Sequence, residues 1–564
     1  MDSLSNGNEN RKSIRTWLLL LLALAGFLNV LASSINSNIE WVPTNLQFGL
    51  FQILPLGYWL GVGLIGLSIV LGFKQRNELL FITQALLLFI SIWGVISLFE
   101  RFPSYWDVYG HYLGVSMVMS TGSTISSGPF TYVSNYPGFF VASAVYSFLG
   151  NIDPLKYLLY YPLFSATFTL IAFYLFSRTY LSIKDYRVAM LISILANVWI
   201  QLVFNPQSLG LAVGIMALVA LEKDSFRWQM VSLAAFTYVV LSHPTTVPFV
   251  LGALLLSEVM IRLPFIRRFT DKSSRPWAIL LFILVWLAWL SFGARNYSRV
   301  LLQLIVERLR FMVEIPEATG RTIVARVSEN IFTVAPQVRT AMILATGAVL
   351  VICLCLYLTK KARPSRRIPA IPLALCLLGA IMVPLDLVLM GAQLYDRGIL
   401  YFMFCAPSVI AIVLFSVPKL SRNWHRLRQV IMGILLTIAV VCSFTAYYQE
   451  SMNVVSDRTI KASEFFYHEM PEGSSVVGGA FVPVIWGDPR NPQFSGTGFF
   501  GVYPEPFRNL TRTVPTAIVF DRSSVLWHQQ WGTIFVYDYY LGQMDNATKV
   551  YESGAYHIFY GRPG

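Results

Sequence analysis

The segment from Ser104 to Tyr112 places one acidic residue among aromatic side chains, just after a long apolar run. Asp107 and His111 are four residues apart, so a helix here would put both side chains on one face. A carboxylate held there could act as general base for an acceptor hydroxyl or ligate a divalent cation. Trp106 and Tyr109 would supply an apolar wall suited to a sugar ring or a lipid. The alternative is an interfacial aromatic belt around an ordinary solvated aspartate.

Two further polar positions lie in predicted turns between apolar runs. Arg397 could hold a phosphate group through two parallel hydrogen bonds, or it could form an ion pair with Asp396 or Asp386. Tyr395, two residues before it, is predicted to contact the same ligand. His243 precedes a proline at another turn and is either a helix-end cap or a second phosphate contact. The candidate functional residues lie in these two turns and in the segment around Asp107.

The composition predicts a polytopic membrane protein that holds these residues. Apolar residues make up 55% of the 564 residues and charged residues only 13%, and the mean hydropathy is +0.59. Soluble domains carry about 25% charged residues. The net charge of +13 comes mainly from basic residues in short segments between apolar runs, as the positive-inside rule predicts. This distribution excludes nucleic acid as a partner, and the lack of a Walker A loop disfavours ATP-driven transport.

The apolar runs are long enough to cross a hydrocarbon core of about 30 Å. They predict about 13 membrane helices. Arg11, Lys12 and Arg15 precede the first apolar run and therefore place the N-terminus in the cytoplasm, and the C-terminus is predicted to lie outside the plasma membrane. The predicted spans are approximately 16–33, 47–73, 79–98, 157–177, 188–204, 208–222, 228–242, 246–263, 277–294, 341–359, 370–391, 400–417 and 430–447. Residues 1–448 are therefore predicted to form an α-helical transmembrane domain. All five cysteines lie inside apolar runs, so no disulfide framework is predicted.

Two long exterior segments interrupt the spans. Residues 99–156 are predicted as the first exterior loop, because its apolar stretch at 137–150 is too short to cross and is expected to lie along the interface. Residues 295–340 mix arginines with apolar residues at near-helical spacing and predict amphipathic surface helices. From 449 to 564 the composition turns soluble and predicts a small α/β domain. Its expected elements are a helix at 460–470, strands at 474–478, 516–520 and 532–537, and a hairpin at 549–560.

This layout resembles the GT-C superfamily of integral-membrane glycosyltransferases, which use polyprenyl-phosphate-linked sugars. Asp107 matches the acidic position of the family's first exterior loop, and the Tyr136–Gly138 step matches the start of its surface helices. The number of spans, the second exterior loop and the C-terminal exterior domain are similar to the oligosaccharyltransferase branch. Two features depart from that branch. That branch has a second acidic motif later in the first exterior loop, whereas no acidic residue lies between Asp107 and Asp153 here. It also has a Trp-Trp-Asp-Tyr-Gly motif in the exterior domain, for which Val484–Asp488 is a poor match.

The resemblance implies an inverting glycosyltransferase that moves a sugar from a polyprenyl-phosphate lipid to a glycan, lipid or protein acceptor. Asp107 would be the general base with His111 as its helper, and Arg397 and His243 would bind the donor phosphate. Trp106, Tyr109 and Tyr395 would contact the substrates. None of these residues is assigned to a metal ion.

Three alternatives stay open. An oligosaccharyltransferase-like enzyme would transfer a whole glycan and would need a divalent cation such as Mg²⁺ or Mn²⁺. A lipid-linked sugar flippase or transporter would bind the lipid without chemistry. A non-catalytic assembly subunit would use its exterior domain to bind partners.

Overall fold

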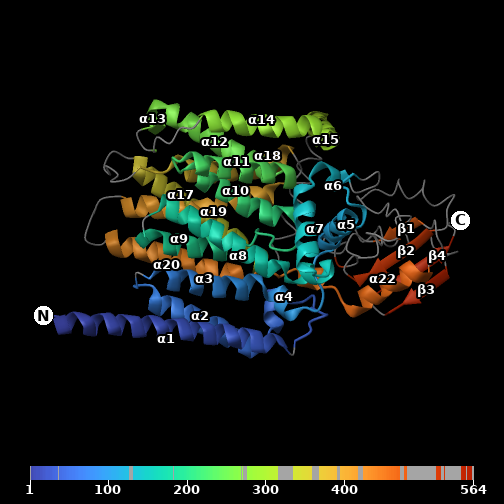
Figure 1. Ribbon diagram of the computed structural model, residues 1–564, viewed down its shortest axis with the longest axis horizontal. Helices are drawn as coiled ribbons and strands as arrows, with labels where there is room; N and C mark the ends of the chain where they lie inside the picture. Colours follow the sequence, from blue (N-terminus) through green and yellow to red (C-terminus); the bar gives the residue numbers. More distant parts are fainter. Residues whose placement is uncertain are drawn as a thin grey trace.

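The helices of the membrane part run side by side along one axis (Figure 1). The computed structural model describes the chain except residues 1, 36, 76, 126–130, 182, 268–269, 271–275, 315–333, 359–366, 390–393, 417–423, 470–474, 479–515, 523–525, 527–547, 554–555 and 562–564. The parallel helices are α1 (Asp2–Ile35), α2 (Leu56–Gly72), α3 (Glu78–Trp93), α8 (Pro154–Tyr180), α9 (Ile183–Ala196), α10 (Pro206–Leu221), α11 (Phe226–Ser242), α12 (Thr246–Arg262), α14 (Pro276–Phe292), α17 (Val334–Leu358), α18 (Ala370–Leu389), α19 (Tyr395–Ser416) and α20 (Trp424–Ser443).

Among the described helices, five are long and apolar enough to cross a membrane by themselves: Ser13–Ile35, Pro154–Tyr180, Val334–Leu358, Tyr395–Phe415 and Arg426–Ser443. Shorter apolar helices, among them α2, α3, α10, α14 and most of α18, lie alongside them. Leucines on their outer faces remain exposed, which suits contact with lipid chains rather than water. The predicted architecture, a helical multi-pass membrane protein with a small C-terminal α/β part, is confirmed.

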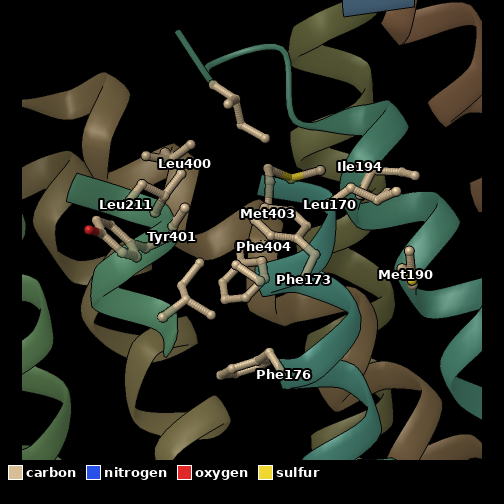
Figure 2. Packing of buried hydrophobic residues seen from close by; sticks show 14 of the residues in the cluster. Leu170, Phe173, Phe176, Met190, Ile194, Leu211, Leu400, Tyr401, Met403 and Phe404 are labelled. Carbon is tan, nitrogen blue, oxygen red and sulfur yellow. The ribbon is translucent and has the colours of Figure 1, made fainter. Parts of the chain in front are cut away.

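Helix α19 occupies the centre of this bundle. Figure 2 shows the packing around it, where the Phe404 ring lies 4.2 Å from Phe173 and 4.6 Å from Phe176, centroid to centroid. These rings are tilted rather than face to face, the arrangement that aromatic quadrupoles favour. Tyr401 on the same helix stacks on Phe249 of α12 at 4.2 Å. Because α19 is held on several sides, its first turn, which carries Arg397, has a fixed position.

Two glycines set the close approach of α18 and α19. A Cβ added to Gly379 would lie 2.6 Å from the carbonyl oxygen of Gly398 and 2.6 Å from the backbone nitrogen of Phe402. Small residues at helix crossings let backbones meet in this way inside membranes. The crossing lies next to Arg397, so the spacing of these helices also sets the depth of that side chain.

Gly379→Ala is therefore expected to force α18 and α19 apart and to destabilise the fold by about 2 kcal/mol, the usual cost of overpacking. The measurement is the melting temperature of the purified protein in detergent. Gly347→Ala on α17 is the matched control, because a Cβ there meets nothing within 4 Å. Equal melting temperatures for both variants would contradict this account of the crossing.

Short helices cover one end of the bundle. They are α4 (Val95–Phe99), α5 (Trp106–Thr121), α6 (Thr131–Asn135) and α7 (Gly138–Gly150). Figure 1 shows α7 lying across the ends of the long helices, the orientation that an interface-lying helix would have. A Cβ at Gly114 of α5 would lie 2.7 Å from the Phe140 ring of α7, so these two helices pack closely. Helix α15 (Arg295–Glu314) follows α14 at the same end, which we call the loop end.

The C-terminal part also lies at the loop end, while the start of α1 and the short α13 (Pro264–Arg267) lie at the opposite end (Figure 1). The C-terminal part begins with α21 (Glu450–Asn453) and α22 (Asp457–Glu469). The strands β1 (Ser475–Gly478), β2 (Thr516–Asp521), β3 (Thr548–Glu552) and β4 (Tyr556–Gly561) form one sheet in the order β1-β2-β4-β3. β1 and β2 are parallel, and β3 and β4 form the predicted hairpin. The strand predicted at 532–537 lies outside the described residues.

Several predicted boundaries are wrong. The helix predicted over 188–204 ends at Ala196, because the Asn197 side chain donates to the Leu400 carbonyl oxygen at 2.9 Å and the backbone turns away. The span predicted from residue 47 begins at Leu56, after a 3₁₀ turn, η1 (Gly49–Ile53). Arg397 was expected in a turn but belongs to the first turn of α19, and α17 already begins at Val334. At the end of α9, a tertiary contact rather than hydropathy decides where the helix stops.

Candidate functional site

A cavity of about 370 Å³ opens at the loop end of the bundle. Four of the predicted site residues line it: Asp107, His111, His243 and Arg397. They come from α5, the turn between α11 and α12, and α19. The remaining lining residues are Gly110, Tyr132, Val133, Phe140, Gln201, Asn205, Pro206, Gln207, Pro244, Thr245 and Tyr297. The fold thus gathers one carboxylate, one guanidinium and two imidazoles around a single space.

Asp107 and His111 form a contact on one face of α5, as their spacing predicts. His111 Nε2 lies 3.2 Å from Asp107 Oδ2. The His111 ring is wedged beside Phe140, at a centroid distance of 5.7 Å, and near Phe139 and Tyr132 at 6.2 Å each. Its side chain is 13% exposed while that of Asp107 is 51% exposed. The carboxylate therefore faces the cavity, and the imidazole holds it from the side.

The surroundings of Asp107 keep it ionised. Burial raises its pKa, but the charge and hydrogen bond of His111, with Arg397 and His243 farther away, outweigh burial and bring the pKa below its ordinary value. Asp107 also lies in the first turn of α5, where the positive end of the helix dipole favours an anion. A carboxylate that is ionised at neutral pH can accept a proton.

His243 caps α11 and is almost fully buried. Its Nδ1 lies 2.8 Å from the Thr246 hydroxyl oxygen and 3.3 Å from that of Thr245. Burial lowers its pKa to about 3, and the positive charges of Arg397 and His111 act in the same direction, against Asp107. The ring is therefore neutral, so it can offer a phosphate a hydrogen bond but no charge.

The His243 ring is accordingly expected to stay neutral from pH 8 down to about pH 4, since its pKa is lowered to about 3. Nitrogen NMR of ¹⁵N-histidine-labelled protein measures this directly, and His243→Gln assigns the resonance. A His243 signal that titrates between pH 5 and 8 would contradict the assignment of a neutral ring.

Arg397 reaches the cavity from the first turn of α19. The chain leading into this turn is anchored by Asp386 of α18, whose Oδ2 accepts a hydrogen bond of 2.7 Å from the Leu394 backbone N–H. Asp386 is 1% exposed, so this anchor is inside the protein. Asp386, one of the two ion-pair partners predicted for Arg397, thus shapes the turn through the Leu394 backbone.

Two of the three aromatic residues predicted to contact the substrates lie outside the described cavity lining. Tyr109 is buried outside the cavity lining, and its hydroxyl donates to the Pro103 carbonyl oxygen at 3.0 Å. Tyr395 begins α19 and is not among the lining residues either. The Trp106 side chain lies outside the described part of the structure. Tyr132, Phe140 and Tyr297 are the aromatic residues in the described lining.

A second side of the cavity is formed by amide side chains that are not among the predicted site residues. Gln201, Asn205 and Gln207 line it from the irregular segment between α9 and the first turn of α10. Asn205 caps α10, since its Oδ1 accepts from the Ser208 backbone N–H at 2.9 Å. Amides of this kind hydrogen-bond sugar hydroxyls, because they carry both donors and acceptors.

The described side chains offer few ligands for a metal ion. Within them, no group of three histidine, cysteine or carboxylate residues is close enough to hold a metal ion. Asp107 and His111 contribute two such groups and bind one another. The cavity as described is organised around an arginine and a carboxylate.

The sequence matches no protein-family model and no curated protein. Among solved structures, the chain is similar to the oligosaccharyltransferase of Archaeoglobus fulgidus in its apo form, with a TM-score of 0.49 and 12% identity, over 81% of this chain and 72% of that one. It is also similar to ArnT from Cupriavidus metallidurans in the apo state, with a TM-score of 0.36 and 14% identity, over 86% of this chain and 97% of that one.

Proposed function

We propose that this protein is a membrane glycosyltransferase that moves a sugar from a polyprenyl-phosphate donor to an acceptor hydroxyl at the loop end of the bundle. The observation that carries the proposal is one cavity lined by a carboxylate, an arginine and a neutral histidine. These are the groups that proton removal and departure of a phosphate require. They lie at the end of a membrane bundle, where a lipid-borne substrate can reach them.

In the proposed reaction, the acceptor oxygen attacks the anomeric carbon while Asp107 takes the hydroxyl proton. The bond between that carbon and the phosphate oxygen breaks, and its electron pair leaves with the polyprenyl phosphate. The attack comes from the face opposite the leaving group, so the anomeric configuration inverts. Arg397 binds the phosphate oxygens and compensates the charge that develops on them.

The smaller polar groups have supporting roles in this scheme. His111 holds the Asp107 carboxylate through the 3.2 Å contact. His243, as a neutral ring, donates or accepts a hydrogen bond beside the phosphate. The Tyr132, Phe140 and Tyr297 wall and the opposing amides fit the apolar face and the hydroxyl edge of a sugar ring.

The size of the cavity favours a small donor sugar. Ligand pockets commonly span about 300–1,000 Å³, and about 370 Å³ is near the lower limit. One sugar ring and its phosphate fill such a space, whereas a preassembled glycan would extend far outside it. We therefore favour transfer of a single sugar over transfer of a whole oligosaccharide.

The proposed location is the plasma membrane, with the N-terminus of α1 in the cytoplasm and the loop end outside. The basic Arg262 and Arg267 lie at the end opposite the cavity, in and beside α13. Such residues favour the cytoplasmic side. The acceptor, whether glycan, lipid or protein, would then approach from outside.

The test of this function uses the full-length protein in nanodiscs with a panel of polyprenyl-phosphate sugars and with glycan, lipid and peptide acceptors that carry free hydroxyl groups. Release of free polyprenyl phosphate, followed by mass spectrometry, is expected with at least one donor and is expected to survive EDTA. Saturable donor binding with no release from any donor would contradict an enzyme and would indicate a transporter or an assembly subunit. Activity that needs Mg²⁺ or Mn²⁺ would favour the oligosaccharyltransferase-like alternative.

A further inference from the structure

One buried side chain of the cavity has polar atoms that the described protein leaves without a partner. Gln207, the second residue of α10, lines the cavity and is only 7% exposed. Within the described part of the chain, its carboxamide makes no hydrogen bond. The carboxamide is also not one of the described polar groups that are both unpaired and enclosed by other atoms. It therefore faces the open space of the cavity, where its donors and its acceptor are free for a ligand.

The two neighbouring amides differ from Gln207, because they bind each other and the backbone. Asn205 Nδ2 donates to Gln201 Oε1 at 3.5 Å, and Asn205 Oδ1 accepts from the Ser208 backbone N–H at 2.9 Å. These hydrogen bonds hold the start of α10. Of the three amides, Gln207 has no such structural hydrogen bond among the described residues.

The start of α10 is fixed by its own contacts, so Gln207 is presented to the cavity at a defined place. The Ser208 hydroxyl donates to the Asn205 carbonyl oxygen at 2.9 Å and lies 2.9 Å from the Tyr161 hydroxyl oxygen. Pro206 begins the helix with a φ that is already helical. A binding group on such a rigid element needs little ordering when a ligand arrives, so its hydrogen bonds contribute to affinity and selectivity.

Gln207 lies one helical turn from the place where α10 packs against His243. A Cβ added to Gly210 would lie 3.3 Å from the His243 Cβ. Gln207 precedes Gly210 by three residues and therefore lies on the same face of the helix, about 5 Å nearer its start. The proposed function puts the donor phosphate beside His243. The group next to Gln207 is then the sugar that this phosphate carries.

A sugar hydroxyl matches the free carboxamide. A hydroxyl group both donates and accepts, and so does an amide, whereas a phosphate oxygen would use only the amide N–H. Arg397, in the same cavity, is the group proposed for the phosphate. A sugar that lacks the matching hydroxyl would leave the buried carboxamide unpaired, which is costly. One group would thereby bind the correct sugar and reject its analogues.

We propose that Gln207 is a specificity-determining residue, whose carboxamide hydrogen-bonds one ring hydroxyl of the donor sugar. The inference rests on the proposed function, since it assumes a lipid-linked sugar in this cavity. It adds that the sugar is recognised from the start of α10, and not by the groups that carry out the transfer. Selectivity and catalysis should therefore be separable by mutation.

The test compares donors that differ by one hydroxyl group. The probes are polyprenyl-phosphate glucose, mannose and galactose, with the single-deoxy analogues of whichever binds most tightly, titrated into the full-length protein in nanodiscs. Wild-type affinity is expected to fall about 10- to 100-fold for the analogue that lacks the hydroxyl facing Gln207, and little for the others. Gln207→Met removes the amide at similar volume, so it should bind that analogue and the parent donor within about threefold of each other.

Controls separate a sugar contact from a structural effect. Gln229→Met makes the same substitution near the start of α11, roughly 20 Å from His243 along that helix, and should keep the wild-type discrimination. Both variants should melt at the wild-type temperature, because the Gln207 carboxamide binds no described residue. If Gln207→Met fails to fold, Gln207→Ala removes the same amide and carries the same expectation.

The possible results distinguish this proposal from the proposed function. Wild-type discrimination in Gln207→Met would overturn the sugar contact. An equal loss of affinity for the parent donor and every deoxy analogue would also overturn it, since the amide would then contact the phosphate or shape the cavity. Lost discrimination, with no release of polyprenyl phosphate from any donor by the wild type, would support the sugar contact and contradict the transfer reaction. No binding of any probe would contradict both.

Discussion

Asp107→Asn is expected to lower kcat at least about 10³-fold, equivalent to about 4 kcal/mol of transition-state stabilisation, while donor affinity changes less than about threefold. Asparagine keeps the size of the side chain but cannot accept a proton, so general base catalysis, with its usual 10²- to 10⁴-fold effect, is lost. Donor binding should survive because Arg397, rather than Asp107, binds the phosphate. The removal of one negative charge near the phosphate even favours binding slightly. Single-turnover release of polyprenyl phosphate measures the effect.

Two comparison variants make this result specific. Asp153→Asn changes an aspartate of the same exterior segment that caps α8 through the Leu155 backbone N–H, and asparagine caps equally well, so this variant should be fully active. His111→Gln should cost less than Asp107→Asn, because His111 only holds the carboxylate in the proposed mechanism. A His111→Gln enzyme that is inactive while Asp107→Asn keeps part of its activity would make His111 the base.

Arg397→Gln is expected to weaken donor binding about 10- to 100-fold, since hydrogen bonds to charged groups contribute about 1.5–3 kcal/mol. It is also expected to lower kcat about 10²-fold, because the guanidinium compensates charge on the departing phosphate. Arg397→Lys should fall between, since lysine keeps the charge and loses the paired hydrogen bonds. Isothermal titration of the nanodisc-embedded protein with a donor, followed by turnover measurements, separates the two effects.

The control for the two Arg397 variants is Arg101→Gln. Arg101 follows α4 by two residues. It is paired with Glu40 at 2.9 Å and Asp457 at 3.4 Å, and it is not among the cavity-lining residues. Its replacement should leave donor affinity unchanged. Equal loss of affinity in both variants would indicate a general electrostatic effect of the exterior surface instead of a phosphate site at Arg397.

The sequence predicted the charged side of the cavity well. The i, i+4 spacing of Asp107 and His111 needs only a helix, and helices that alternate direction across a membrane must bring the exterior ends together. Arg397 stood out because the positive-inside rule disfavours arginine on that side. These are local or topological rules, so no tertiary contact had to be known.

The same rules predicted the aromatic and amide sides poorly. Tyr109 follows Asp107 by two residues, which on a helix turns it away from the carboxylate, and it is buried elsewhere. The end of α9 depends on the hydrogen bond from Asn197 to Leu400, residues far apart in the chain, while the apolar Leu202–Phe204 stretch resembled a continuing helix.

The most direct test of the account is donor binding and single-turnover release measured side by side for the wild type, Asp107→Asn and Arg397→Gln in the same nanodiscs, with the active donor. The account predicts that Asp107→Asn binds the donor as the wild type does and releases almost no polyprenyl phosphate, whereas Arg397→Gln binds it weakly. Near-normal release by Asp107→Asn would contradict the assignment of the base, and wild-type binding by Arg397→Gln would contradict the phosphate site.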